Sequence, residues 1–441
     1  MSNSFDNIHP GLTHEAALKI LLIPVDQLES MSDYYMATSH LINFPGSITE
    51  KALLQLVENK SKELAIVIAR RKAVEVLARL DCQDAIKSIG DCLNDTDHYL
   101  VENAAWALRR LNSQDSQHHQ IMIGLLDDPS QNQRILIQSL AALGVKEALS
   151  KIKVLAEDSD PGVRGAALSA LVRLDNQREC LQRLEPQLTL PNQMNRQSAI
   201  QDVIDCKAFS LLPAVLHSPV SPAFRMRALE ALWPQGVAQY QGFDLIRLLD
   251  DLLLDHPNNL ELIHQYEDAR PAEFLVQELF STDFSRCYLA LKTLSDKPSE
   301  ELWPLLEKRW YGDAYNDYGA HYFFVCLFGL ILDWRKNAKN KIETILLNAI
   351  DNQRPQFLKS RPAAILALSK LNPEKFRIEF RKLISLEHMP FWQCRYAALL
   401  SLGNDRSCAE WQYVFEHLHS LSQDTSSYVC LKINHLIASD G

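Results

Sequence analysis

Glycine and proline, on which tight turns depend, are scarce in this sequence. The 441 residues include 14 glycines and 19 prolines, whereas leucine and alanine are frequent and evenly spread. A β-sandwich or β-barrel needs many tight turns, and those turns rely on glycine and proline at defined positions. The composition therefore predicts a mainly helical chain. Its length predicts either several domains or one extended array of repeats.

Signals for a membrane, for secretion and for nucleic-acid binding are also missing. The longest apolar run, residues 322–332, has 11 residues and is too short to cross a bilayer. The N-terminus lacks the basic and apolar stretches of a secretory signal. A formal net charge of −10 disfavours nucleic acid as a partner, because phosphate binding requires clustered lysine and arginine. We expect a soluble, cytoplasmic protein without a membrane span.

Motifs for metal, nucleotide and nucleophile chemistry are absent as well. The nine cysteines are scattered and include no C-x-x-C pair, so neither a disulfide framework nor a zinc site is predicted. The sequence has no G-x-x-x-x-G-K-[ST], G-x-G-x-x-G, H-E-x-x-H or G-x-S-x-G. We therefore expect no metal and no permanently bound cofactor. An enzyme built on this chain would act mostly by positioning a reactive partner.

A repeat of about 31 residues is present instead. The pattern R-x-x-A-x-x-x-L occurs five times, starting at Arg70, Arg164, Arg225, Arg361 and Arg395. The leucines that close four successive units, at positions 80, 111, 143 and 174, are 31, 32 and 31 residues apart. Residues spaced by four and then three lie on one stripe of an α-helix, and the small alanine allows close approach of a neighbouring helix.

Helix-starting residues precede the repeat alanine by seven positions in several copies. Asp97, Asp160 and Ser221 are such N-caps, and a proline follows two of them at the first helical position. Each unit is therefore predicted to be a helical hairpin that buries its apolar stripe only against its neighbours. The predicted fold is all-α, a curved α-solenoid with a concave binding face. An ordinary irregular helical domain is the alternative.

The strength of the repeat varies along the chain and predicts four segments. Residues 1–60 form an N-terminal helical cap, and residues 61–235 hold the regular repeats. Residues 236–350 keep helical periodicity but lose the consensus, and residues 351–441 hold C-terminal repeats and a cap. Degenerate units are expected at the ends of a solenoid. A degenerate middle suggests specialised residues there.

Part of that middle segment is rich in aromatic residues. Residues 303–334 contain ten aromatics in 32 positions, against 8% overall. Among them, Tyr311, Tyr315, Tyr318 and Tyr322 follow a 4-3-4 spacing. Asp317 occupies the N-cap position of its copy, so one interpretation is a helix cap. The other is a ligand site, because a tyrosine beside a carboxylate can stack on a planar ligand and hydrogen-bond or protonate it. Both can hold together.

Two smaller clusters also combine aromatic and charged residues. Tyr34 and Tyr35 lie in the N-terminal segment, where a helix that seals the end of the solenoid is the structural alternative to a ligand role. Glu102, Trp106 and Arg109 are spaced by four and three residues, and Trp106 lies off the core stripe. An inner, ligand-facing position and an inter-repeat packing role are both open for this tryptophan.

The repeat copies VENAAWALRRL and DSDPGVRGAALSALVRL resemble the HEAT-like repeats of phycobilin lyases. The N-terminal SDYYMATSHLINFPG and the aromatic YGDAYNDYGAHYFF are more specific. They resemble the long, single-chain members of the E/F-type lyases that act on phycoerythrin. The resemblance covers most of the chain. It implies HEAT-like repeats and a role in the cyanobacterial cytosol.

The resemblance also implies a reaction. Such lyases take a free linear tetrapyrrole, usually phycoerythrobilin, as substrate and deliver it to one cysteine of a phycobiliprotein subunit as a thioether. The implied partner is a phycoerythrin subunit, with the α subunit favoured. Some long members also convert phycoerythrobilin to phycourobilin, a step that requires an acid and a base near the bilin. A non-enzymatic scaffold or chaperone for phycobiliprotein subunits is the alternative, and a HEAT-repeat adaptor unrelated to pigments is a third possibility.

On this basis we predict the residues that contact the bilin. Asp317 holds the pyrrole N–H groups or shuttles a proton, and Tyr318 acts as the acid or as a stacking partner. Trp106 and Tyr315 form walls, and Arg109 pairs with a propionate. The remaining predicted contacts are Glu102, Tyr311, His321, Tyr34 and Tyr35. The nucleophilic cysteine belongs to the acceptor protein, while Cys82, Cys326 and Cys394 are predicted to be core residues.

Overall fold

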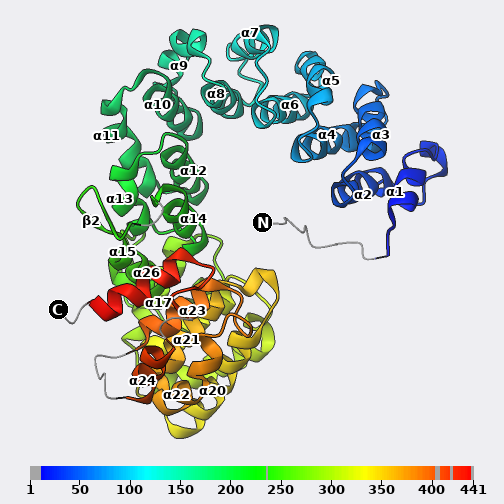
Figure 1. Ribbon diagram of the computed structural model, residues 1–441. Coiled ribbons are helices and arrows are strands. Elements are labelled where there is room, and N and C mark those ends of the chain that lie inside the picture. Colours follow the sequence, from blue (N-terminus) through cyan, green and yellow to red (C-terminus); the bar gives the residue numbers. More distant parts are fainter. Residues whose placement is uncertain (1–10, 235–236, 403–407, 418–420, 439–441) are drawn as a thin grey trace. The chain divides into compact units, whose positions relative to one another are not determined.

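The computed structural model describes residues 11–234, 237–402, 408–417 and 421–438. These residues are almost entirely helical. The one strand pair among them is a short antiparallel hairpin of β1 (Gln239–Tyr240) and β2 (Phe243–Asp244). The chain divides into two compact units, residues 1–183 and 184–441 (Figure 1). The division falls inside the segment that the sequence assigns to regular repeats.

The first unit is a two-layer row of helical hairpins. Its α-helices are α1 (His14–Ile20), α2 (Asp33–His40), α3 (Ser47–Glu58), α4 (Leu64–Arg79), α5 (Ile86–Asp91), α6 (His98–Arg110), α7 (Ser116–Leu125), α8 (Gln133–Ala142), α9 (Leu149–Leu155) and α10 (Pro161–Asp175). Helix α11 (Leu181–Leu184) spans the boundary between the units. Helices α2, α4, α6, α8 and α10 contact one another in chain order (Figure 1), and the odd-numbered helices pack outside them. This arrangement confirms the predicted all-α solenoid of helical hairpins.

The predicted caps are confirmed. Asp97 accepts a hydrogen bond from the N–H of Tyr99 at 3.2 Å, and Asp160 accepts from Gly162 at 2.6 Å. Ser221 caps the helix that follows it in the same way. Each such cap stabilises its helix by about 1 kcal/mol. With Asn132, which caps α8, these residues define where α6, α8, α10 and the helix after Ser221 begin.

The repeat arginine has a structural role that its spacing alone did not reveal. Arg164 is only partly buried and donates to carbonyls of the loop before its helix. In other copies the guanidinium is buried and donates to carbonyl groups at the end of the preceding helix, as Arg70 does to Val57 at 3.1 Å and Arg361 to Ile350 at 2.8 Å. These carbonyls lack partners within their own helix. In three copies the same guanidinium also pairs with a later aspartate, forming Arg70–Asp95, Arg225–Asp255 and Arg395–Asp424.

The second unit continues the pattern but folds back on itself. Its α-helices are α12 (Gln193–Asp205), α13 (Leu212–His217), α14 (Pro222–Leu232), α15 (Leu245–Leu254), α16 (Ala272–Glu278), α17 (Phe284–Ser295), α18 (Ser299–Arg309), α19 (Ala320–Leu330), α20 (Lys336–Asp351), α21 (Ser360–Leu371), α22 (Pro373–Leu383), α23 (Trp392–Leu400), α24 (Ala409–Glu416) and α26 (Ser427–Ala438). Helices α17, α19, α21, α23 and α26 contact one another in chain order. Helix α15 packs against α14 and also against α21 and α23 (Figure 1), so it links two parts of the unit that are far apart in sequence.

Short 3-10 and π segments connect these helices. The 3-10 turns are η1 (Val25–Gln27), η2 (Leu41–Asn43), η3 (Gln83–Ala85), η4 (Cys92–Asn94), η5 (Lys146–Ala148), η6 (Arg178–Cys180), η7 (Glu185–Thr189), η8 (Phe209–Leu211), η9 (Pro257–Asn259) and η11 (Pro355–Phe357). The segment η10 (Trp310–Ala314) is a π-helix that continues α18 and interrupts the helical register of the aromatic-rich region.

The buried carboxylate of Asp255 stabilises the second unit, and its removal measures its contribution to the free energy of unfolding. Asp255 and its partner Arg225 have side chains that are 1% and 2% exposed. Asp255→Ala leaves a guanidinium buried without its counter-charge, which typically costs about 3–5 kcal/mol. We expect urea denaturation, followed by tryptophan fluorescence, to show a loss of this size. Six of the seven tryptophans lie in this unit and report on it.

The matched control is Glu300→Ala. It breaks the Arg335–Glu300 pair, whose side chains are 70% and 54% exposed, and exposed pairs are worth about 1 kcal/mol or less. Equal losses in the two variants would contradict a central role for Asp255.

Candidate functional site

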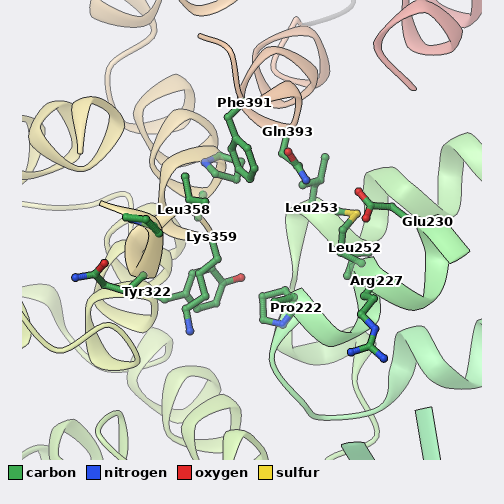
Figure 2. A pocket seen from close by; sticks show the side chains of 16 residues that line it. Pro222, Arg227, Glu230, Leu252, Leu253, Tyr322, Leu358, Lys359, Phe391 and Gln393 are labelled. Carbon is green, nitrogen blue, oxygen red and sulfur yellow. The ribbon is translucent and has the colours of Figure 1, made fainter. Parts of the chain in front are cut away.

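A pocket of about 370 Å³ lies within the second unit, between α14 and α15 on one side and α21 with the residues before it on the other. Figure 2 shows Pro222, Arg227 and Glu230 on one wall and Tyr322 and Lys359 on the opposite wall. Small-molecule sites typically occupy about 300–1,000 Å³. The pocket therefore has the size of a ligand site.

The lining is mostly apolar, with a few charged groups. Leucine, proline and alanine side chains from α14, α15 and α21 make up much of the surface, and Phe391 contributes an aromatic ring beside α23. The charged residues are Arg227, Glu230 and Lys359. Glu230 is exposed at the rim, yet neighbouring groups remove enough water from its carboxylate to raise its pKa. An apolar surface with a few polar groups is typical of sites that bind organic ligands.

Lys359 is held against two aromatic rings. Its amine lies 4.9 Å from the centroid of the Phe284 ring and 5.3 Å from that of Tyr322. Burial lowers the pKa of this amine because it disfavours the charged form, while nearby acidic groups, including Asp317, oppose the shift. No carboxylate of the described residues forms a salt bridge with it.

Beneath the pocket, Tyr322 belongs to a buried hydrogen-bond network. Its hydroxyl and that of Tyr288 both donate to Asp255, the second at 2.5 Å. Arg225 donates to the other carboxylate oxygen at 2.7 Å and to the Tyr288 hydroxyl at 2.7 Å. Burial and the adjacent carboxylate raise the pKa of both tyrosines well above the ordinary value. The two hydroxyls therefore stay protonated, and the network fixes the ring of Tyr322 in the pocket wall.

The predicted aromatic cluster directly precedes Tyr322 in the chain but has a different form from the one expected. Tyr311, Tyr315 and Tyr318 are 58%, 51% and 64% exposed. The π-helix and the turns after it interrupt the regular helix, so residues 313, 317 and 321 do not lie along one helical face. The three exposed tyrosines are available to a ligand or partner, and their binding of a bilin stays a prediction.

Asp317 caps a helix, as one of the two interpretations of the sequence proposed. Its carboxylate accepts hydrogen bonds from the N–H groups of Gly319 and Ala320, both at 2.8 Å. These donors belong to the first turn of α19 and have no partner within the helix. The carboxylate remains exposed, so a role beside a ligand is compatible with the cap and stays a prediction.

His321 is a correction to the predicted site. Its ring is buried, with Nδ1 3.0 Å from the Ser360 hydroxyl and the ring centroid 4.9 Å from that of Trp310 and 4.8 Å from that of Phe357. Burial lowers the pKa of His321 to about 4, because the charged imidazolium loses water there. The side chain stabilises the packing of α19 on α21 and is not open to a bilin.

Of the two predicted N-terminal contacts, Tyr34 is buried and Tyr35 is exposed. Tyr34 is buried and its hydroxyl donates to the carbonyl of Ile23, so it packs the end of the first unit and is not open to a ligand. Tyr35 is exposed, and the amine of Lys72 lies 5.7 Å from its ring centroid. The cap interpretation therefore accounts for Tyr34, and Tyr35 keeps a free face.

The cluster on α6 is partly exposed, as expected for residues off the core stripe. Trp106 has the guanidinium of Arg79 5.8 Å from its ring centroid, and Glu102 and Arg109 are partly exposed on the same helix. These residues belong to the first unit, while Tyr311 to His321 belong to the second. The structure thus places the predicted contacts in two separate units.

The pocket itself was missed by the sequence reasoning. Arg227 lies two residues after the repeat arginine of its copy, and Lys359 lies two residues before the repeat arginine of another. The repeat register could have indicated that both flank a buried helix stripe. It could not have indicated that α14 and α21 face one another, because that pairing skips several repeats.

The sequence is similar to those of known proteins. HEAT repeats match residues 119–204. The chain is 43% identical over 377 residues to the bilin biosynthesis protein CpeY of Synechococcus sp. (strain WH8020), covering 85% of this chain and 90% of that protein. The chain belongs to the CpeY family of bilin biosynthesis proteins. The resemblance to the long, single-chain phycobilin lyases with HEAT-like repeats is thereby confirmed.

Two further similarities accompany this match. An uncharacterized phycocyanin operon protein Y of Pseudanabaena tenuis (strain PCC 7409) is 35% identical over 401 residues, covering 90% of this chain and 93% of that protein. The complex of CpcE and CpcF of phycocyanin lyase from Nostoc sp. PCC7120 has a chain with 23% identity and a TM-score of 0.48, covering 57% of this chain and 99% of that one. In the part of the chain that the structure describes, no helix has the length and apolar character needed to cross a membrane.

The cap made by Asp317 gives a stability prediction. Asp317→Ala removes an acceptor for two N–H groups, and we expect it to destabilise the second unit by about 1 kcal/mol. Asp317→Ser keeps a capping oxygen and should retain most of the stability. Urea denaturation of the two variants measures the difference. An Asp317→Ala variant as stable as the wild type would show that the cap contributes nothing.

Proposed function

We propose that this protein is a lyase that attaches phycoerythrobilin through a thioether to a cysteine of a phycoerythrin subunit. The observation that supports the proposal is 43% identity over 85% of the chain to a bilin biosynthesis protein. In the reaction, the acceptor sulfur forms a C–S bond to the ethylidene carbon of ring A. The double bond is consumed and the thiol proton is replaced by a proton on the adjacent ring carbon, so no oxidant or reductant is needed.

The state of the chain's own cysteines supports an acceptor nucleophile. All nine lie in the described residues and none forms a disulfide there; burial raises the pKa of eight of them, so that the reactive thiolate is disfavoured. For Cys326 and Cys394 the pKa rises to about 12. Cys82 and Cys394 are buried as predicted, whereas Cys326 is only partly buried and borders a small cavity. None of these eight thiols is an activated nucleophile.

In this proposal the chain positions the bilin and supplies a proton donor. Tyr318 is exposed and precedes Tyr322 of the pocket wall by four residues, and Asp317 lies close enough to Lys359 for its charge to influence that amine. A phenol and a carboxylate next to a bound bilin can give and take the protons that thioether formation requires. The same pair would serve conversion of phycoerythrobilin to phycourobilin, which likewise moves one proton on and one off.

Attachment to an apo-phycoerythrin subunit is the direct test. We expect the purified protein to speed formation of a covalent bilin adduct, detected by fluorescence of the denatured subunit after electrophoresis. An acceptor subunit with its target cysteine replaced by serine should take up no pigment covalently. The absorbance of the product distinguishes phycoerythrobilin from phycourobilin and decides whether isomerisation occurs. A protein that binds the subunit but leaves the attachment rate unchanged would be a chaperone.

The proposed proton carriers have their own prediction. Tyr318→Phe keeps the ring and removes the acidic hydroxyl, and Asp317→Asn keeps a capping oxygen and removes the charge. General acid–base groups typically contribute about 10²–10⁴-fold, so we expect attachment to slow by at least tenfold in each variant. Tyr99→Phe, at a tyrosine that is as exposed as Tyr318 and belongs to no predicted contact, is the control and should react at the wild-type rate. Wild-type rates in all three variants would remove Asp317 and Tyr318 from the mechanism.

A further inference from the structure

The pocket carries more positive charge than its own walls neutralise. Its lining includes two cations, Arg227 and Lys359, and one anion, Glu230. Within the described residues neither cation forms a salt bridge with a carboxylate. Other buried cations of this unit have polar partners: Arg225 pairs with Asp255, Lys432 pairs with Asp250, and Arg361 bonds to uncharged acceptors. Lys359 is half-buried and, in the part of the chain that the structure describes, has only aromatic rings as partners, whereas Arg227 is exposed.

Lys359 is the more enclosed of the two pocket cations. Its amine lies among aromatic and aliphatic side chains, where a charged group loses much of its hydration. The faces of Phe284 and Tyr322 compensate for part of that loss through cation–π contacts. A carboxylate of a ligand would compensate for the remainder, because ion pairs strengthen where water is excluded.

The wall opposite Lys359 presents complementary groups. Arg227 offers a guanidinium suited to bidentate contact with a second carboxylate. Glu230 stands on the same helix and can accept hydrogen bonds from N–H groups of a ligand (Figure 2). Apolar surface from Leu252 and Leu253 lies between them and the far wall. The ligand that fits is apolar and flat, with two carboxylates and several N–H donors.

We propose that this pocket binds one linear tetrapyrrole, and that Lys359 and Arg227 pair with its two propionates while Glu230 accepts from pyrrole N–H groups. The site depends on the proposed function for the identity of its ligand, and it adds a place on the chain and a means of recognition. A volume of about 370 Å³ suits the central, propionate-bearing rings, and leaves the reactive end ring to extend toward an acceptor.

Binding of phycoerythrobilin and of its dimethyl ester, measured without any acceptor subunit, tests this site. The ester keeps the ring system and removes both negative charges. Absorbance titration of the full-length wild-type protein should show the free acid bound at least about tenfold more tightly than the ester. In Lys359→Met and Arg227→Gln that ratio should fall several-fold, and in the double variant it should approach one.

Two further variants separate charge from packing. Lys359→Arg keeps the positive charge and should recover most of the preference for the acid. Lys308→Met removes an exposed lysine of α18 that does not line the pocket, and should bind like the wild type. Circular dichroism melting curves establish that each variant is folded before it is titrated.

The outcomes distinguish the site from the proposed function. A wild-type protein that binds neither compound would contradict both. If the wild type prefers the acid and the Lys359→Met, Arg227→Gln double variant keeps that preference in full, the pocket is not the propionate site, whereas the lyase proposal stands. A third outcome combines two results: the double variant loses the preference for the acid, and the wild type attaches no pigment to the acceptor. This outcome would support the site and exclude the lyase reaction.

Discussion

The fold depends on one interaction, the buried guanidinium of the repeat arginine. In an array of helical hairpins, each first helix ends in carbonyl groups that its own turns cannot satisfy, and burial makes that deficit costly. The arginine supplies the missing donors from the second helix, as Arg70 and Arg361 show. In three copies its remaining N–H groups reach an aspartate further along the chain. One side chain thus closes a hairpin and joins it to its neighbour.

The second unit modifies this interaction where the repeat consensus is weakest. Asp255 pairs with Arg225 in the usual way, but it also accepts the hydroxyls of Tyr288 and Tyr322. The corresponding aspartates Asp95 and Asp424 each pair with one repeat arginine, whereas Asp255 bonds to residues of three helices, α14, α17 and α19. The degenerate middle of the chain is therefore where the helices turn back on one another, and the pocket forms above that junction.

Periodicity predicts helices well because it reports local geometry. The caps at Asp97 and Asp160 and the buried stripe of each repeat were all accessible from spacing. The burial of His321 and Tyr34 was not, because it depends on which neighbouring helix covers them. For the same reason the sequence could not predict that Arg227 and Lys359 line one pocket, because no local signal specifies that α14 faces α21.

Residues in contact are much farther apart in sequence in the second unit than in the first, which implies different folding behaviour. In the first unit the linking bonds span about one repeat, as from Asn103 to Arg71, 32 residues apart. In the second, Asp255 meets Tyr322 across 67 residues and Lys432 meets Asp250 across 182. High contact order slows folding, because the entropy of closing long loops is lost before the contacts between distant residues can stabilise the chain. The first unit can therefore form repeat by repeat during synthesis, whereas the pocket forms only once α21 and the start of α23 have packed near α14 and α15.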